Sequence, residues 1–125
     1  MARLDGAAMA DSDGVFEQFS DALLFPSYFG WNWPALSECL RDLRWLSADR
    51  YLVVIENAPR VLRENGKERE VLFSILVDAG RRWATSYDAK YYGKGPFFHA
   101  VLQCDEDDVE SLKAEIATAL GPNAR

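Results

Sequence analysis

The sequence predicts a small α/β domain in which helices pack against a three-stranded parallel sheet. The chain has 125 residues and 49% of them are hydrophobic, which suits one compact domain with its own core. Two bare apolar runs, YLVVIE and PFFHAVLQC, indicate buried strands, and helical patterns fill the sequence around them. We therefore expect the order strand, helix, helix, strand, helix, helix, strand, helix, without an internal repeat.

The first elements are a short strand and an amphipathic helix. ARLDG has the form of an edge strand that ends in an Asp-Gly turn, and ADSDG offers Asp or Ser as a helix N-cap. The apolar residues of this helix fall on one face, which indicates ordinary packing; they are Val15, Phe16, Phe19 and Leu23.

A second helix is predicted after Pro26 and Gly30 break the chain, with Asn32 as its N-cap. Its apolar stripe follows helical spacing and consists of Leu36, Cys39, Leu40, Leu43 and Leu46. On the opposite face we expect Glu38, Arg41, Asp42 and Trp45. The tryptophan on this acidic face either contacts a partner or folds back beneath the next loop or the C-terminal helix.

The middle of the chain supplies the central strand and a long helix. YLVVIE lacks polar alternation, which predicts a strand covered on both faces. APRVLREN is expected to be a short helical piece that ends with a C-cap at Asn65-Gly66, and a longer helix is expected over 67–83. Phe73 and Val77 lie off the apolar side of that helix, so more than one neighbour should pack against it.

The last third contains a loop, a strand and a helix. The loop over 86–96 is longer than most, which favours a functional or mobile role. The strand PFFHAVLQC follows, and the acids of DEDD then suit the N-terminus of a helix. That helix has a narrow apolar stripe of Val109, Leu112, Ile116 and Leu120, and its acids are expected to cap it.

Charge and cysteine content limit the possible partners. A net charge of −6 and a pI near 4.7 disfavour nucleic acid and anionic membranes, and they favour a basic protein partner. No export signal or apolar stretch of membrane-spanning length is evident, so a cytoplasmic location is expected. Cys39 and Cys104 are expected to be buried reduced thiols, with no metal and no cofactor.

The sequence gives little support for an enzyme. Common nucleophile, phosphate-binding and zinc motifs are absent, and the single histidine, His99, is expected to be a structural residue on a central strand. Glu38 and Asp42 lie four residues apart on one helix, a spacing that usually marks a solvated face. No catalytic residue is therefore predicted, and a hydrolase that uses this pair is a distant alternative.

Aromatic residues crowd the segment just before the second helix. Tyr28, Phe29, Trp31 and Trp33 cannot all enter the core from so short a loop, so at least one should be partly exposed. Aromatic side chains rimmed by carboxylates suit the contact with a cationic cleft of another protein.

The stretch LLFPSYFGWNWPALSECLRDL resembles the signature of the barstar family, inhibitors of small secreted microbial ribonucleases. In that signature a proline-aromatic-aromatic-glycine loop leads through an asparagine into an acidic helix with a Cys-Leu pair. The matching residues are Pro26, Tyr28, Phe29, Gly30, Asn32, Cys39 and Leu40. The resemblance covers residues 1–103 and implies the family's three-stranded parallel sheet. Residues 104–125 are then an additional C-terminal helix of the same single domain.

The resemblance also implies a function and a set of contact residues. It implies an immunity protein, without cofactor, that plugs the active site of a barnase-type or guanyl-type ribonuclease. Glu38 matches the key helix carboxylate, which takes the place of a substrate phosphate, and Tyr28 matches the loop aromatic. The full expected contact set is Tyr28, Phe29, Gly30, Trp31, Asn32, Trp33, Glu38, Arg41, Asp42 and Trp45.

Two residues depart from the family pattern. Pro34 stands where many members carry an aspartate, and Ser37 where many carry a tryptophan. The alternative function is therefore a binding module of the same fold that neutralises a different basic protein or a toxin that is not a ribonuclease.

Overall fold

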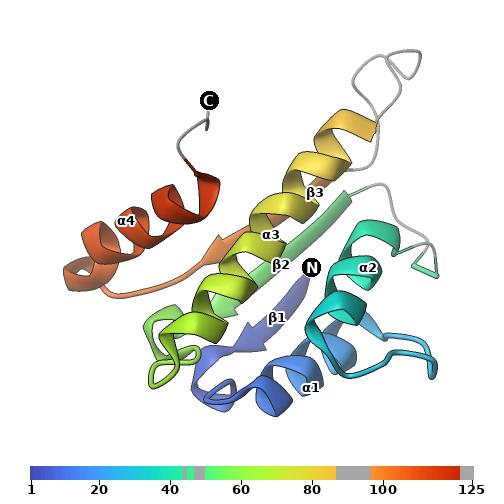
Figure 1. The fold of residues 1–125 in the computed structure, drawn as a ribbon, viewed down its shortest axis with the longest axis horizontal. Helices are drawn as coiled ribbons and strands as arrows, with labels where there is room; N and C mark the ends of the chain where they lie inside the picture. Colours follow the sequence, from blue (N-terminus) through green and yellow to red (C-terminus); the bar gives the residue numbers. More distant parts are fainter. Residues whose placement is uncertain (44, 47–49, 87–96, 122–125) are drawn as a thin grey trace.

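The computed structural model describes residues 1–43, 45–46, 50–86 and 97–121 and confirms the predicted fold class. The strands are β1 (Ala2–Asp5), β2 (Arg50–Glu56) and β3 (Phe97–Leu102), and they form a parallel sheet in the order β1-β2-β3. The helices are α1 (Ser12–Leu23), α2 (Trp33–Asp42), α3 (Gly66–Ser86) and α4 (Val109–Leu120). Short 3-10 turns η1 (Gly6–Ala8), η2 (Ala58–Arg60) and η4 (Glu106–Asp108) lie between them (Figure 1).

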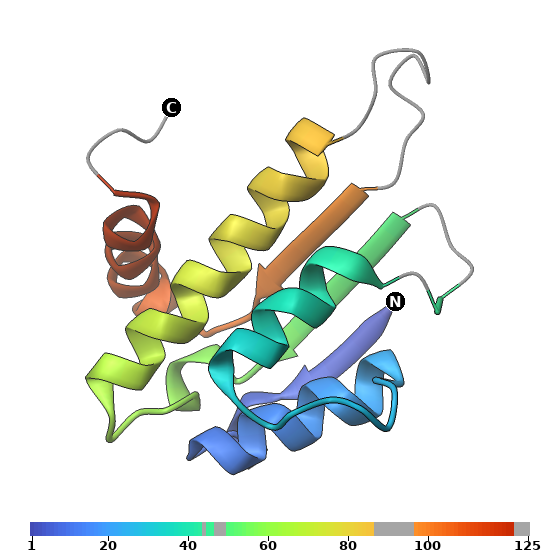
Figure 2. The ribbon, with the colours of Figure 1, turned by 45° about the vertical axis from the view of Figure 1, so that its right-hand side comes forward.

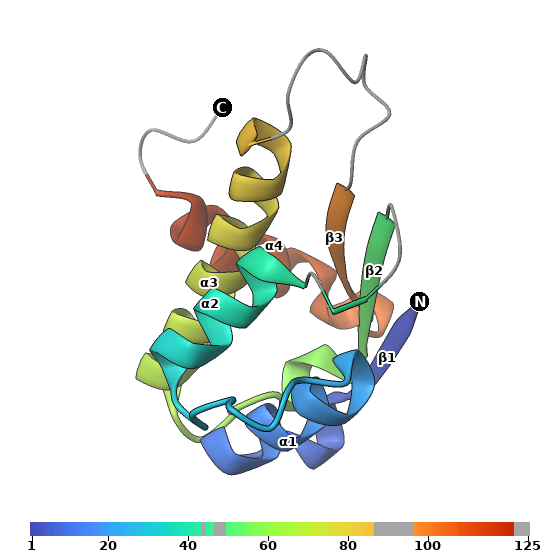
Figure 3. The same ribbon diagram turned by 90° about the vertical axis from the view of Figure 1, so that its right-hand side faces the viewer.

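The core lies between the helices and one face of the sheet. Figures 2 and 3 show α1, α2 and α3 on the same side of the three strands. Leu4 of β1, Val53 and Ile55 of β2 and Phe98 of β3 face this side and are buried. The helices bury the residues predicted for their apolar faces, among them Val15, Phe16, Phe19, Leu23, Leu36, Cys39, Leu40 and Leu72. The 3.6-residue pattern was therefore a sound guide to which helix faces point inward.

The prediction that β2 is covered on both faces is wrong. β2 is the central strand, but on the side away from the helices Leu52 is 37% exposed and Val101 of β3 is 42% exposed. Val54 on that side is buried, because it lies in register between Arg3 and Val101 of the flanking strands. The absence of polar alternation in YLVVIE therefore reflects a central position within the sheet, while one face stays open.

The prediction that His99 lies on a central strand is also wrong. β3 is an edge strand, and His99 is exposed on the open side opposite Leu52. The apolar neighbours that suggested a central strand belong instead to the helix-covered face, where Phe98 is buried. The edge position predicted for β1 is confirmed.

The Asn65-Gly66 pair begins a helix rather than ending one. After η2 the chain turns, and α3 starts at Gly66. The Asn65 side chain accepts a hydrogen bond from the Glu68 backbone N–H at 3.1 Å, and it donates to the Glu68 carboxylate at 2.7 Å. This reciprocal cap satisfies donors at the helix N-terminus, so the pair was assigned to the wrong end of a helix.

The second helix ends earlier than its apolar stripe suggested. α2 stops at Asp42, and Leu43 takes a left-handed conformation with φ 50° as its C-cap. Leu43 is still buried and Leu46 is half-buried, so the core contacts are kept although both lie outside the helix. Trp45 also leaves the helix, so it does not share a helical face with Glu38 and Asp42.

The C-terminal helix α4 docks on α3 through one partly buried ion pair and a narrow apolar contact. Arg69 of α3 donates to Glu115 through Nε at 2.6 Å and through Nη2 at 2.9 Å. Leu112 is buried, whereas the other stripe residues are half-buried. Neither Asp105 nor Asp108 makes a side-chain capping hydrogen bond, contrary to the role expected for these acids.

Phe73 is buried beneath Arg69, whose guanidinium lies 5.0 Å from the ring centroid, and Val77 is half-buried. The prediction that α3 has several neighbours is confirmed, because it packs against α2, β3 and α4. Of the loop predicted over 86–96, only Ser86 falls within the described residues, where it is the last residue of α3. No helix in the described ranges combines the length and the apolar character needed to cross a membrane.

Candidate partner-binding surface

The aromatic loop (residues 25–32) is held in place by its own hydrogen bonds. The Phe29 N–H donates to the Pro26 carbonyl at 3.0 Å and closes a turn. Asn32 then caps α2, because its side-chain oxygen accepts the Ala35 N–H at 2.8 Å, and its amide donates back to the Gly30 carbonyl at 3.1 Å. The cap predicted from the sequence is confirmed, and it fixes the loop relative to the helix.

Trp31 is the tryptophan that this loop presents to solvent. It is 50% exposed and has a left-handed backbone with φ 53°, which is strained for a bulky residue. Its ring lies edge-on to Phe16 at 6.4 Å between centroids and tilted against Phe29 at 5.6 Å. These contacts hold an exposed indole in one place, which lowers the entropy it would lose on binding.

Two other tryptophans near the loop are tied into the fold. The Trp33 indole N–H donates to Glu68 of α3 at 3.1 Å, and its ring packs on Phe16 at 4.9 Å. The Trp45 indole N–H donates to the Leu23 carbonyl at 2.9 Å. Trp45 therefore folds back onto the protein, which is one of the two alternatives predicted for it. Among the described residues it packs on the end of α1 and on Phe25 of the aromatic loop, and not beneath the next loop or the C-terminal helix.

A small recess lies between the aromatic loop and α2. It has a volume of about 110 Å³ and is lined by Tyr28, Phe29, Gly30, Ala35, Glu38, Cys39, Asp42 and Trp45. We call it the carboxylate recess, because the carboxylates of Glu38 and Asp42 are among the groups that line it, together with Tyr28. Tyr28 is 71% exposed and Glu38 is exposed, so both side chains are accessible to a partner.

The electrostatic character of the recess is visible at Cys39. Burial raises the pKa of the Cys39 thiol, and the nearby charges of Asp42 and Glu38 raise it further. The thiol therefore stays protonated, and the recess carries negative potential. Such potential favours a cationic group of a partner.

The remaining predicted contact residues are placed differently. Phe29 is only 6% exposed and belongs mainly to the core, where it supports Trp31 and Phe25. The half-buried Arg41 lies along its own helix and donates through Nε to the Ser37 carbonyl at 3.3 Å. Of the predicted contact residues, the recess is therefore lined by Tyr28, Phe29, Gly30, Glu38, Asp42 and Trp45, whereas Trp31, Asn32, Trp33 and Arg41 do not line it.

Sequence reasoning missed residues that shape this surface. Ala35 and Cys39 line the recess. From the sequence, no role was expected for Ala35 and only a core role for Cys39. Ser37 lies on a second hollow of about 420 Å³ between α2 and α3, with Val71 and Ile75 in its wall. The signal for Ser37 was its departure from the family pattern, whereas a small residue such as Ala35 gives none.

The described residues include no group of three or more His, Cys, Asp or Glu side chains that could hold a metal ion. Both described cysteines are free; Cys39 is buried as predicted, but Cys104 is only half-buried.

Fold and comparison together define the class of protein. Three parallel strands with four helices in the described residues form an α/β domain of the barstar type. The family model described as Barstar (barnase inhibitor) matches residues 1–103, so the chain belongs to the barstar family. Members of this family are inhibitors without enzymatic activity, and membership implies an inhibitor of barnase-type ribonuclease. A search of curated proteins found no match. The α4 helix lies beyond the residues that the family model covers.

Proposed function

We propose that this chain blocks the active site of a small basic microbial ribonuclease, of barnase or guanyl type, with the aromatic loop and α2. The observation that carries the proposal is the carboxylate recess, which joins two carboxylates and an exposed tyrosine within the region matched by the family. In this proposal Glu38 occupies the position of a substrate phosphate among cationic side chains of the enzyme. Charge-assisted hydrogen bonds to a carboxylate are the strong kind, and they give the complex its affinity.

Tyr28, Gly30 and Asn32 contact the enzyme beside Glu38 in this proposal. Tyr28 and Gly30 line the recess, and Asn32 holds the loop at the start of the helix. Asp42 adds a second negative charge, and Trp45 also lines the recess. Inhibition takes place inside the producing cell, where the chain acts as an immunity protein.

A different basic partner is the second candidate, and one observation favours it. Ser37, the residue before Glu38, lines the hollow between α2 and α3, where many family members carry a tryptophan. Pro34 stands where many members carry an aspartate, so the chain lacks that charge. A partner that fills this hollow with its own side chain would differ from the ribonucleases that other members bind. The partner in that case is a basic toxin without ribonuclease activity.

The test is inhibition of RNA cleavage by a panel of small secreted ribonucleases, with Glu38→Gln as the variant. We expect at least one enzyme to be inhibited at submicromolar concentration, and Glu38→Gln to weaken inhibition by about 10-fold or more, because a charged hydrogen bond contributes about 1.5–3 kcal/mol. Glu110→Gln on α4 makes the same change of charge at an exposed site and should leave inhibition unchanged.

Raising the salt concentration should weaken the parent more than Glu38→Gln, because the variant has one charge fewer to screen. Equal inhibition by parent and Glu38→Gln would contradict the proposed mechanism. Failure to inhibit any enzyme of the panel at micromolar concentration, together with tight binding to a basic toxin that is not a ribonuclease, would establish the second candidate.

A further inference from the structure

The helix layer extends beyond the edge of the sheet on the β3 side. α3 packs on β3, whereas α4 packs mainly on α3. Figures 1 and 2 show α4 on the outer side of α3, away from α2. The Arg69–Glu115 pair holds α4 in place, and Arg81 donates to the Leu120 carbonyl at its far end at 2.9 Å. No strand of the described chain lies beyond β3 in the sheet.

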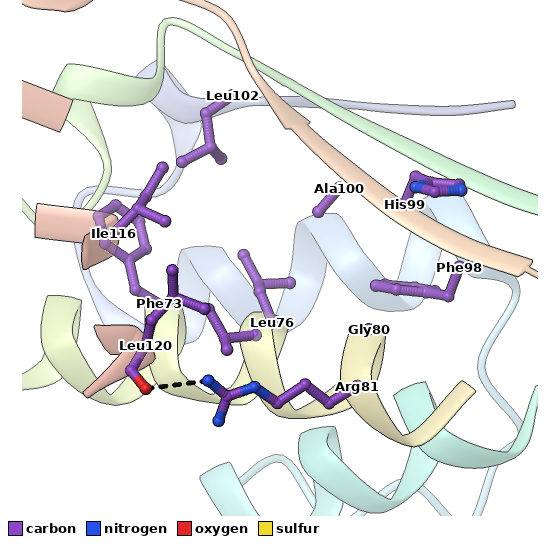
Figure 4. A pocket seen from close by; sticks show the side chains of 11 residues that line it. Phe73, Leu76, Gly80, Arg81, Phe98, His99, Ala100, Leu102, Ile116 and Leu120 are labelled. Carbon is purple, nitrogen blue, oxygen red and sulfur yellow. Dashed lines mark hydrogen bonds between the residues drawn. The ribbon is translucent and has the colours of Figure 1, made fainter. Parts of the chain in front are cut away.

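A groove of about 420 Å³ occupies the space between β3, α3 and α4. Its lining is mainly apolar and includes Leu76 and Val77 of α3, Ile116 and Leu120 of α4, and Phe98, Ala100 and Leu102 of β3, as Figure 4 shows for most of these side chains. Arg81 and His99 are the polar side chains of the lining. Ala100 is exposed, although it lies on the helix side of β3 between buried Phe98 and half-buried Leu102. The groove therefore reaches the strand itself.

The backbone of β3 offers hydrogen-bonding groups along this groove. Gln103, which follows β3, donates to the Ile55 carbonyl of β2 at 2.9 Å. In a parallel strand the backbone groups of alternate residues point to the same neighbour, so Val101 and His99 also face β2. Phe98, Ala100 and Leu102 then direct their N–H and C=O groups outward, where no described strand pairs with them.

We propose that the outer edge of β3 and the groove under α4 bind an extended segment of a partner protein as a fourth strand. Backbone groups of the segment pair with Phe98, Ala100 and Leu102, and its alternate apolar side chains enter the groove beneath Ile116 and Leu120. This form of recognition uses the free edge of a sheet for affinity and pockets at alternate side chains for specificity. Phe97–Leu102 contains no lysine, proline or carboxylate, the residues that protect many edge strands from pairing.

Charge favours a neutral or basic segment over a second copy of this chain. Each copy carries a net charge of −6, so two copies repel one another. The groove lies on β3, α3 and α4, whereas the carboxylate recess lies on the aromatic loop and α2. The two sites share no residue, and this proposal does not rest on the proposed ribonuclease inhibition.

The test measures binding of a capped probe peptide, acetyl-Lys-Val-Thr-Val-Thr-Val-Lys-amide, to the full chain by calorimetry. Two further peptides carry N-methyl groups on alternate amides, one on the valines and one on the threonines. A bound strand directs the backbone N–H groups of either its valines or its threonines toward β3, but not both. We therefore expect one methylated peptide to lose binding by at least 10-fold while the other binds like the parent.

Variants of the chain separate this site from others. Ala100→Phe fills the groove and Ile116→Lys places a charge in it, so each should weaken the peptide at least 10-fold. Val101→Thr changes a side chain on the opposite face of the same strand and should leave binding unchanged. Circular dichroism checks folding, and Ile116→Lys on α4 keeps the test decisive if Ala100→Phe misfolds.

Three results would overturn the proposal: no binding of the unmethylated peptide at millimolar concentration, equal weakening by both methylated peptides, or undiminished binding to folded Ile116→Lys. Elution of the chain as a dimer that Ala100→Phe dissociates would assign the edge to a second copy instead. Ala100→Phe and Ile116→Lys should inhibit ribonuclease as well as the parent does. A failure of the strand-binding proposal can therefore be told apart from a failure of the proposed ribonuclease inhibition.

Discussion

Removal of the Glu115 carboxylate should weaken the docking of α4 and destabilise the whole domain. Arg69 is 9% exposed and its guanidinium is held by Glu115 at 2.6 and 2.9 Å. In Glu115→Ala the cation keeps the carbonyls of Val61 at 2.6 Å and Pro59 at 3.2 Å and its place over the Phe73 ring, but it loses the carboxylate that it contacts in the parent. A buried charge then lacks its counter-charge.

The expected loss of unfolding free energy lies between the values for a fully buried and a fully exposed ion pair. Breaking a fully buried pair costs about 3–5 kcal/mol, and losing an exposed pair costs about 0–1 kcal/mol. The Glu115 side chain is 37% exposed and Arg69 keeps two carbonyl partners, so we expect about 2 kcal/mol. For a domain of this size that corresponds to a fall in Tm of roughly 6–10 °C.

Thermal and urea unfolding followed by circular dichroism measures the effect. Lys113→Ala on the same helix is the matched control, because its contact with Glu110 is 3.8 Å long and both side chains are largely exposed. It should change the free energy of unfolding by less than about 0.5 kcal/mol. If Glu115→Ala and Lys113→Ala unfold at the same midpoint, the reasoning about the buried pair is refuted.

Three further predictions concern packing and protonation. Gly6→Ala should lower the free energy of unfolding in urea by about 1–3 kcal/mol, because the Cβ of the new alanine would lie 2.7 Å from the Glu56 carbonyl oxygen. Gly66→Ala is the control, because a Cβ at Gly66 meets open space and should not destabilise the protein. Equal losses of stability in the two variants would contradict this packing argument. Iodoacetamide at pH 8 should modify native Cys39 more slowly than half-buried Cys104, with the difference lost in urea, because the pKa of the Cys39 thiol is raised above its ordinary value of 9.0. The same raised pKa contributes stability below pH 9 that is lost as the pH rises through the folded pKa, so urea midpoints should fall less above pH 9 in Cys39→Ala than in the parent.

Local sequence patterns were enough to predict most elements of the fold. Asp11 and Asn32 cap α1 and α2 through contacts that span only three residues, so the chemistry of the caps is visible in the sequence. The apolar stripes of α1 and α2 are buried as their spacing indicated, whereas the stripe of α4 is mostly half-buried and Val71 at the start of α3 is exposed. Asn65-Gly66 shows the limit of such patterns, because this pair is compatible with either end of a helix, and only the observed bonds to Glu68 identify the N-terminus.

The position of the candidate site could be predicted from the sequence, but the role of each of its aromatic residues could not. The loop signature pointed to Tyr28, Gly30 and Glu38, and the structure places these three around one recess. The roles of the tryptophans could not be separated in this way, since Trp31 and Trp33 stand two residues apart with the same chemistry. Trp33 reaches Glu68 at a sequence distance of 35 residues, and such a contact leaves no local trace.

The sequence by itself determined the fold class, the helix faces that enter the core, and the family to which the chain belongs, because these depend on spacing within short segments. Tertiary structure alone decided that the sheet is covered on one face, that Trp31 is the exposed tryptophan of the loop, and that a groove runs along β3 beneath α4. Exposure depends on which distant segments pack across from a residue, and hydrophobicity along the chain does not record that choice.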